Sequence, residues 1–315
     1  GIVIAVLLFL VISGGIRRIA SVSTIIVPFM TIGYLLLTII TLVGNASAVP
    51  GAIAAICASA FNGSAMFGGM IGAAFSYGVK RAVNSSGAGF GETPASAAAA
   101  ETPHPATQGL VTAFSVYIDV AVCICSGLMA IVTDCFNVMG PDGATYLHIG
   151  TGSAKMAEQA ATNTAVWVQE GANTALPIGG ILVAIMLACF AYSTCIAYYY
   201  EGEAGLAYLF RNKSAEFRNK LIWIIRIAMP VFFALWSVVP AATVWAVSEI
   251  MFGLMAWFNL IACILLIPTV KKVNDDYFAQ RKAGVSDPYF DPKKLGIENA
   301  DIWMEINADR IKAGK

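Results

Sequence analysis

Hydrophobic residues form long blocks along the chain, and polar residues gather in the stretches between them. An apolar block of about 20 residues is long enough to cross the roughly 30 Å hydrocarbon core of a bilayer as a helix. Charged residues fall mostly between the blocks, as they do where loops leave a membrane. The pattern predicts seven spanning helices, at about 1–13, 24–44, 51–83, 108–133, 177–200, 221–240 and 243–268.

Composition supports the membrane assignment. The chain is 58% hydrophobic and 12% charged, whereas soluble domains average about 25% charged residues. It begins at Gly1 inside an apolar run, without a basic leader or a cleavage site. We therefore interpret the first segment as the later part of a helix rather than as a signal peptide. We predict an all-α polytopic membrane protein and expect an N-terminal part to precede this sequence.

Basic residues predict the orientation, because Lys and Arg near helix ends remain in the cytoplasm. The 134–176 loop has one basic and four acidic residues and is predicted to face outward. We predict a multi-pass protein of the cytoplasmic membrane whose polar segment 271–315 is a cytoplasmic tail, solvated or on the membrane surface, with no residue that indicates a regulatory role. The basic residues that mark alternate ends of the segments are Arg17, Arg18, Lys80, Arg81, Arg211, Lys213, Arg218, Lys220, Lys271 and Lys272.

Cysteine and histidine give little support for a cofactor. The seven cysteines lie almost entirely in apolar runs, without CxxC spacing, which favours buried small hydrophobes over metal ligands or disulfides. The two histidines, His104 and His148, are in loops, whereas a membrane haem needs axial ligands inside helices. We expect no cofactor, no nucleic-acid partner and no enzymatic activity, because no nucleophile, base and orienting group occur together.

The third segment, 51–83, is too long for an upright helix, since 33 residues of helix measure about 50 Å. Its centre, NGSAMFGGMIG, is rich in glycine, which favours unwinding. A helix broken near the membrane midplane is a mark of many secondary transporters, which bind substrate through the freed backbone groups. Candidate substrate-binding residues are Ser64, Gly68 and Gly69, with Phe67 packing beside them. Close packing of small residues against a neighbouring helix explains the same pattern without a substrate.

The fifth segment contains adjacent hydroxyls, Ser193 and Thr194, in an otherwise apolar stretch. Hydroxyl oxygens are hard ligands that suit Na⁺; the alternative is that they bond back to their own helix. Asp119 and Glu249 are acids within or near spans. Intramembrane acids are costly and often mark a cation or proton pathway, although Glu249 also fits an interface position.

The stretch VNSSGAGFGETP follows the third segment and raises the question of phosphate binding. Its GxGxG spacing is not the GxGxxG dinucleotide fingerprint, and it follows a membrane segment rather than a strand. The glycines instead predict a tight turn after the span. Ser85, Ser86, Gly87 and Gly89 are therefore candidates for a gate at the cytoplasmic side rather than for a substrate site.

Four stretches resemble, in order, the signature segments of the alanine or glycine:cation symporters of the amino acid-polyamine-organocation superfamily. They are GGIRRIASVSTIIVPFM, GAGFGETPASAAAAETPHPATQGLVTAFSVYIDV, FAYSTCIAYYYEGEAGLAYLF and GLMAWFNLIACILL. The resemblance implies a leucine-transporter-like fold of two inverted five-helix repeats. Residues 1–50 would be the last two helices of the first repeat, its first three being absent, and 51–270 the second repeat, with a helical lid in the 134–176 loop.

The resemblance also implies a function. These prokaryotic carriers couple uptake of a small amino acid to Na⁺ or sometimes H⁺, so we expect Na⁺-coupled import of alanine or glycine across a lipid bilayer. Ser193 and Thr194 would be sodium ligands, completed by helices absent here. Gly87 departs from the family, which commonly has Glu at that place in Ser-Asn-Glu-Ala-Gly. The alternative is a non-transporting membrane sensor or structural subunit that keeps the transporter fold.

Overall fold

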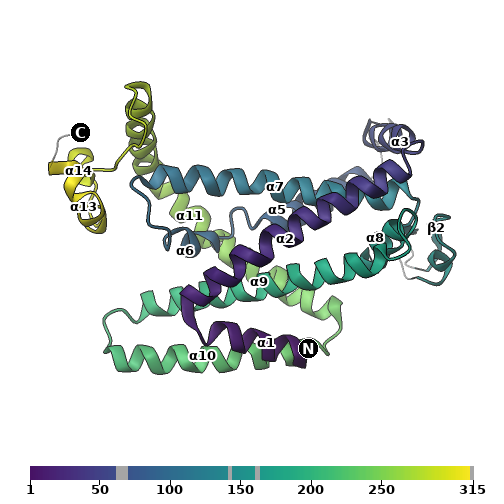
Figure 1. Ribbon diagram of the computed structural model, residues 1–315, viewed down its shortest axis with the longest axis horizontal. Helices are drawn as coiled ribbons and strands as arrows, with labels where there is room; N and C mark the ends of the chain where they lie inside the picture. The colour runs from purple at the N-terminus through teal and green to yellow at the C-terminus, as the bar shows by residue number, and fades with distance from the viewer. Residues whose placement is uncertain (62–69, 141–143, 160–163, 313–315) are drawn as a thin grey trace. The chain divides into compact units, whose positions relative to one another are not determined.

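The computed structural model describes residues 1–61, 70–140, 144–159 and 164–312 of the chain and is mostly helical (Figure 1). Helical elements precede and follow one small antiparallel sheet in the described residues. The helices are α1 Ile2–Ile12, α2 Gly15–Gly44, α3 Val49–Phe61, α5 Met70–Ser86, α6 Thr93–Ala97, α7 Pro105–Val132, α8 Thr164–Asn173, α9 Gly179–Leu209, α10 Ala215–Trp236, α11 Ala241–Lys282, α12 Pro292–Leu295, α13 Ile302–Ile306 and α14 Ala308–Lys312, with strands β1 Asn137–Met139 and β2 Tyr146–Ile149 and a 3₁₀ helix, η1 Ala154–Glu158.

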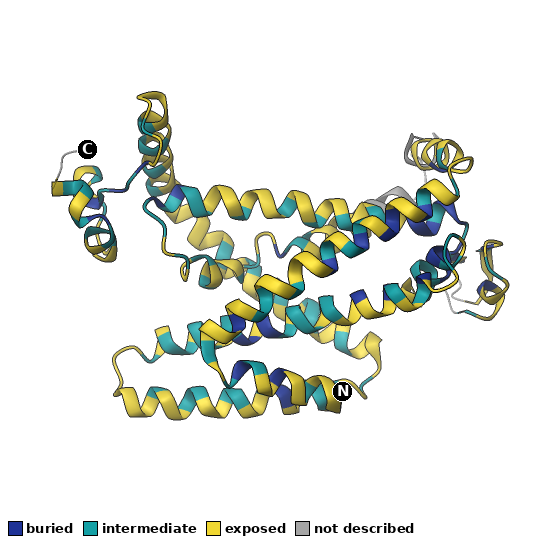
Figure 2. Ribbon diagram, in the orientation of Figure 1, coloured by how far each residue is buried: buried dark blue, intermediate teal, exposed yellow. Residues whose placement is uncertain are grey.

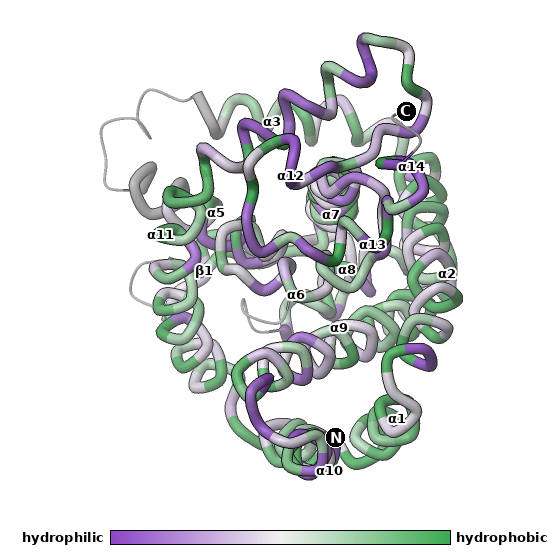
Figure 3. The backbone as a smooth tube through the Cα atoms, turned by 90° about the vertical axis from the view of Figure 1, so that its left-hand side faces the viewer, coloured by the Kyte–Doolittle hydropathy of each residue, from purple (hydrophilic) through white to green (hydrophobic). Residues whose placement is uncertain are grey.

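Among the described residues, five helices are long and apolar enough to cross a membrane: α2, α7, α9, α10 and α11. Two shorter apolar helices cover Ile2–Ile12 and Val49–Ala58. Exposed residues dominate the five long helices (Figure 2), and hydrophobic residues prevail along them while the C-terminal segment is polar (Figure 3). Apolar side chains that face outward on helices of this length are typical of a lipid environment. The chain is a multi-pass membrane protein.

Helix bounds differ from the prediction where a helix continues beyond its apolar block. Helix α2 begins at Gly15, before the predicted start at 24, and includes Arg17 and Arg18. Helix α11 runs through Pro268 to Lys282 instead of ending near 268. Leaving the hydrocarbon does not end a helix, because its backbone hydrogen bonds are internal and polar side chains are tolerated in water.

The predicted third segment is described as two helices, α3 and α5. Residues 62–69 between them lie outside the described residues, and with them the predicted substrate-binding residues Ser64, Phe67, Gly68 and Gly69. The predicted midplane break therefore stays a prediction.

The described chain divides into two compact units. The first comprises Ile2–Ala82 and Asp119–Tyr199, and its core lies where α2 meets the second part of α7, α8 and the first part of α9. Tyr34 packs with Met129 and Met186, and its ring meets the edge of Phe190 at 5.9 Å between centroids. The Tyr34 hydroxyl also lies 2.7 Å from that of Ser126. A partnered hydroxyl lets a large ring be buried without an unsatisfied polar group.

The 134–176 loop in the same unit contains two strands as well as helices. Helix α8 and the 3₁₀ helix η1 supply its helical part, but β1 and β2 pair as a hairpin with Asn137 opposite Ile149. Asn137 is buried, donates to the carbonyls of Met156 and Gln159 (2.8 Å each) and accepts from the Gly150 amide (3.1 Å). One side chain thus ties the hairpin to η1.

The second unit comprises Val83–Ile118 and Tyr200–Lys315, with Gly1. Its C-terminal segment, predicted to be solvated or on the membrane surface, folds against the connection between α6 and α7. The Asn307 amide donates to the carbonyls of Pro103 (2.8 Å) and Phe290 (2.9 Å). His104 is fully buried against the rings of Tyr277 and Phe290. The sequence of this segment shows only mixed charge. It does not predict these contacts, because they join positions some 200 residues apart.

His104 is held as a neutral ring in this contact. Its Nδ1 accepts a hydrogen bond from the Ala106 amide at the start of α7 (3.2 Å), and its Nε2 lies 3.5 Å from the Asp276 carboxylate. Burial lowers the pKa of His104, and the opposing effect of Asp276 is smaller. A neutral ring with Nδ1 as acceptor is what this cap of α7 requires.

Candidate functional site

The predicted cation ligands lie on successive positions of α9. Ser193 is half-buried, and its Oγ lies 3.7 Å from the sulfur of Met30 on α2, whereas Thr194 is exposed. Both hydroxyls donate to the carbonyl of Phe190, each at 2.9 Å. This is the bonding back to the helix that the sequence offered as the alternative. It uses the hydroxyl hydrogens and leaves oxygen lone pairs available to a cation, so the sodium role stays a prediction.

The glycine loop, defined here as residues 87–92, makes the tight turn that its sequence predicts. Gly87, Gly89 and Gly91 have φ of 63°, 87° and 85°, a left-handed region that only glycine enters without strain. The Phe90 amide closes a turn onto the Gly87 carbonyl at 3.3 Å. Of the predicted gate serines, Ser86 bonds within the turn, accepting from the Ala88 amide at 3.4 Å.

The glycine loop is attached to α11. The side-chain amide of Asn259 donates to the Gly89 carbonyl at 3.0 Å. The ring of Phe90 stacks on that of Phe252 with centroids 4.9 Å apart and planes 11° from parallel. The sequence predicts the turn of the glycine loop but not its partners on α11, because these lie more than 160 residues away.

The carboxylate of Glu92 lies beside Gly87. The side chain of Glu92 folds back over Gly87, so that a Cβ at position 87 would collide with Oε1 of Glu92. The other oxygen, Oε2, is buried and has no hydrogen-bond partner among the described residues. Burial raises the pKa of this carboxyl.

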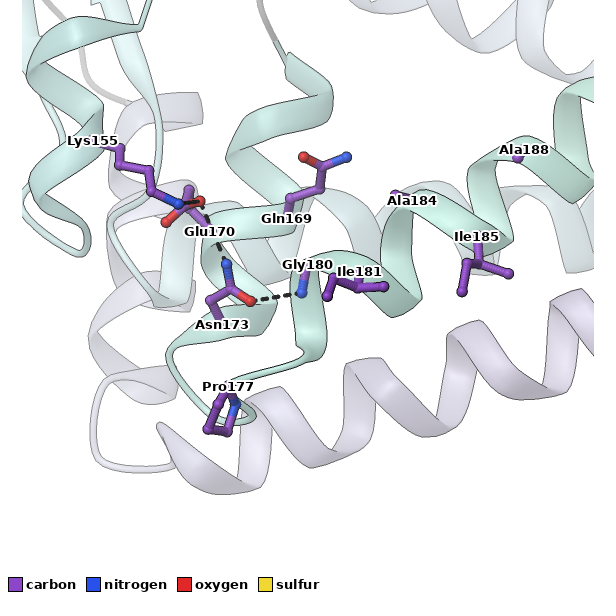
Figure 4. A pocket seen from close by; sticks show the side chains of 10 residues that line it. All are labelled: Lys155, Gln169, Glu170, Asn173, Pro177, Gly180, Ile181, Ala184, Ile185 and Ala188. Carbon is purple, nitrogen blue, oxygen red and sulfur yellow. Dashed lines mark hydrogen bonds and ion pairs between the residues drawn. The ribbon is translucent and has the colours of Figure 1, made fainter.

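A second polar centre lies in the 134–176 loop, at the start of α9 (Figure 4). Glu170 accepts from Lys155 and Ser153, both at 2.8 Å, and Asn173 accepts from the Gly180 amide at 2.7 Å. Burial raises the pKa of Glu170, but the hydrogen bonds from Lys155 and Ser153 and the Lys155 charge outweigh it and lower the pKa overall. An open pocket of about 540 Å³ adjoins these residues.

The predicted site residues fall in different parts of the chain. Ser193 and Thr194 belong to the first unit, the glycine loop to the second, and the predicted substrate residues lie outside the description. No group of three or more His, Cys, Asp or Glu that could hold a metal ion occurs within the described ranges.

A family model described as the sodium:alanine symporter family matches residues 1–292. The chain belongs to this family. The signature stretches, which lie between Gly14 and Leu266, are thereby confirmed as family sequence. The family is one of transporters rather than enzymes, which confirms that prediction as well.

Several curated relatives agree with the family. YrbD of Bacillus subtilis is 42% identical over 302 residues, which is 95% of this chain and 60% of that protein. The sodium/proton-dependent alanine carrier protein of Bacillus sp. strain PS3 is 39% identical over 309 residues, 96% of this chain and 66% of the carrier. The sodium/alanine symporter AgcS of Methanococcus maripaludis is 36% identical over 268 residues, 84% of this chain and 53% of that symporter. The chain thus spans between about half and two thirds of these relatives.

Proposed function

We propose that this chain is the greater part of a secondary transporter of the sodium:alanine symporter family, which imports a small amino acid such as alanine or glycine together with Na⁺. The observation that carries the proposal is the family match over residues 1–292. The names of the PS3 and Methanococcus relatives support alanine and sodium, and the former also names the proton as a coupling ion.

The proposed architecture is the leucine-transporter-like fold, with about seven spanning helices in this chain. Five long apolar helices and two shorter ones support this number. In the proposed arrangement the second inverted repeat occupies 51–270, the 134–176 loop faces outward and the C-terminus lies in the cytoplasm. The clustering of Lys and Arg at alternate helix ends supports that orientation.

The proposed mechanism couples cation and substrate through one conformational change. Na⁺ binding at Ser193 and Thr194 stabilises an outward-open arrangement, and the backbone around Ser64, Gly68 and Gly69, with Phe67 beside it, then binds the amino acid. Rocking of one bundle against the rest releases both inside. The ion drives uptake because it binds the outward-open arrangement better than the inward-open one.

We expect Thr194→Val to raise the Na⁺ concentration for half-maximal alanine uptake by the full-length protein about tenfold, which corresponds to about 1.4 kcal/mol of binding free energy. Valine keeps the volume but removes the ligating oxygen, whereas Thr194→Ser keeps the oxygen and should stay near wild type. The measurement is initial uptake rate against Na⁺ concentration in liposomes.

Thr24→Val is the matched control, because Thr24 is another exposed helical threonine whose hydroxyl bonds back to its own helix, at Ser21 (2.9 Å) and Ala20 (3.1 Å). It should leave the Na⁺ dependence unchanged. Equal Na⁺ dependence in Thr194→Val and wild type would remove Thr194 from the cation site.

A further inference from the structure

The glycine loop and α11 meet through a small, specific contact. Asn259 holds the Gly89 carbonyl, and Phe252 stacks on Phe90. Gly91 lies close against Asn259, since a Cβ at Gly91 would be 2.9 Å from the Asn259 Cβ. Both partners are on α11 and seven residues apart, and positions seven apart share one face of a helix.

The burial of α11 shows that this face is the covered one. Helix α11 is described throughout, and between Met251 and Leu266 only Phe252, Ala256 and Asn259 are half-buried while every other residue is exposed. Their spacing of four and then three residues forms a single stripe. The loop contacts both ends of it, so the stripe is a docking surface within an otherwise outward-facing helix.

The attachment of the glycine loop to α11 is small. It consists of one side-chain hydrogen bond and one ring stack, each a modest stabilising interaction. Glycines with positive φ lie at both ends of the loop, Gly87 and Gly91, and glycine backbone changes conformation at little steric cost. A loop with permissive ends and a small contact can exchange between docked and released states.

We propose that docking of the glycine loop on α11 closes the cytoplasmic gate, and that Phe252 and Asn259 are the positioning residues of the closed state. The inference rests on the proposed function, because a gate acts only in a transporter. Release of the loop would open the path by which the amino acid and cation leave. Neither residue needs to contact the substrate, so each acts on the equilibrium between closed and open states.

The test uses the full-length protein with Phe252→Ala and Asn259→Asp, singly and together. Aspartate nearly keeps the shape of asparagine but cannot donate to the Gly89 carbonyl. Phe258→Ala is the matched control, because Phe258 is on the same helix and 77% exposed. If Phe252→Ala does not fold, Phe252→Leu removes the ring while keeping apolar volume.

Two measurements distinguish a gating role of this contact from a purely structural role. Hydrogen exchange at the amides of residues 88–92, measured without substrate, should become at least fivefold faster in the single variants and faster still in the double variant, but unchanged in Phe258→Ala. The steady-state accumulation of labelled alanine under a Na⁺ gradient should fall at least fivefold while the KM for alanine changes less than twofold, because an unlatched gate leaks without altering the binding site.

Unchanged exchange in the double variant would overturn the docking contact. Faster exchange with normal accumulation would overturn its role as a gate, and an equal effect in Phe258→Ala would overturn its specificity. Failure of the proposed function is distinguishable, because wild-type protein would then show no Na⁺-driven accumulation while the exchange measurement still reports on the loop.

Discussion

Replacing Gly91 with alanine is expected to reduce the initial rate of Na⁺-driven alanine uptake by the full-length protein at least tenfold. Gly91 has φ of 85°, and a residue with a Cβ in the left-handed region costs roughly 1–2 kcal/mol. The added Cβ would also lie 2.9 Å from both Cβ and Oδ1 of Asn259. Strain and crowding act together on the docked loop, so both its position and its hydrogen bond are lost.

Two other glycines separate these causes. Gly89→Ala introduces the strain alone, because Gly89 has φ of 87° and open space around its Cβ position, so its loss of rate should be smaller. Gly253→Ala on α11 meets nothing within 4 Å and carries no positive φ, and should transport normally. Uptake by Gly91→Ala equal to that by Gly253→Ala would contradict the described loop geometry.

Replacing Gly152 with alanine is expected to open the hairpin of the 134–176 loop, with exchange of the amides of β1 (Asn137–Met139) and β2 (Tyr146–Ile149) about a hundredfold faster. A Cβ at Gly152 would collide with the Thr133 carbonyl and lie 2.8 Å from the sulfur of Cys135. Backbone at the end of α7 cannot move aside as a flexible side chain would, and overpacking of this kind typically costs about 1–3 kcal/mol.

The measurement is native-state hydrogen exchange on protein in detergent or nanodiscs. Gly127→Ala, in α7, is the control, because nothing lies within 4 Å of its Cβ position and alanine favours a helix over glycine. Protection of the hairpin in Gly152→Ala at the level of this control would show that the end of α7 and the hairpin are not packed as described.

Apolar block length predicts the long helices well, because a membrane leaves no alternative way to satisfy a buried backbone. It predicts their ends poorly. Helix α11 continues to Lys282 because polar side chains end a span but do not end a helix. The family could also be predicted from the sequence, since the signature stretches extend over most of the chain.

Features built by contacts between distant positions could not be predicted in the same way. The hairpin depends on Asn137, whose partners lie 13 to 22 residues away, and its strands are too short to give an alternating pattern. Docking of the C-terminal segment depends on Asn307 reaching Pro103. No local pattern carries that information.

In the candidate site, too, some features follow from local sequence and others only from the folded structure. The turn of the glycine loop follows from its composition, because three closely spaced glycines permit the positive φ values observed. The return of Glu92 over Gly87 follows only from the folded turn. Ser193 and Thr194 could be selected by residue type, but their hydrogen bonds to Phe190 are those of ordinary helical hydroxyls, so the sodium assignment depends on the family and on the Thr194→Val measurement.

Movement of a small amino acid with Na⁺ by the full-length protein can be measured directly. The direct measurement is accumulation of labelled alanine in liposomes that contain the purified protein, with and without an inward Na⁺ gradient. We predict accumulation above the external concentration only with the gradient, and its loss when a sodium ionophore is added. Absence of accumulation under Na⁺ and proton gradients alike, from folded protein that still binds alanine, would contradict cation-coupled transport and favour a non-transporting sensor.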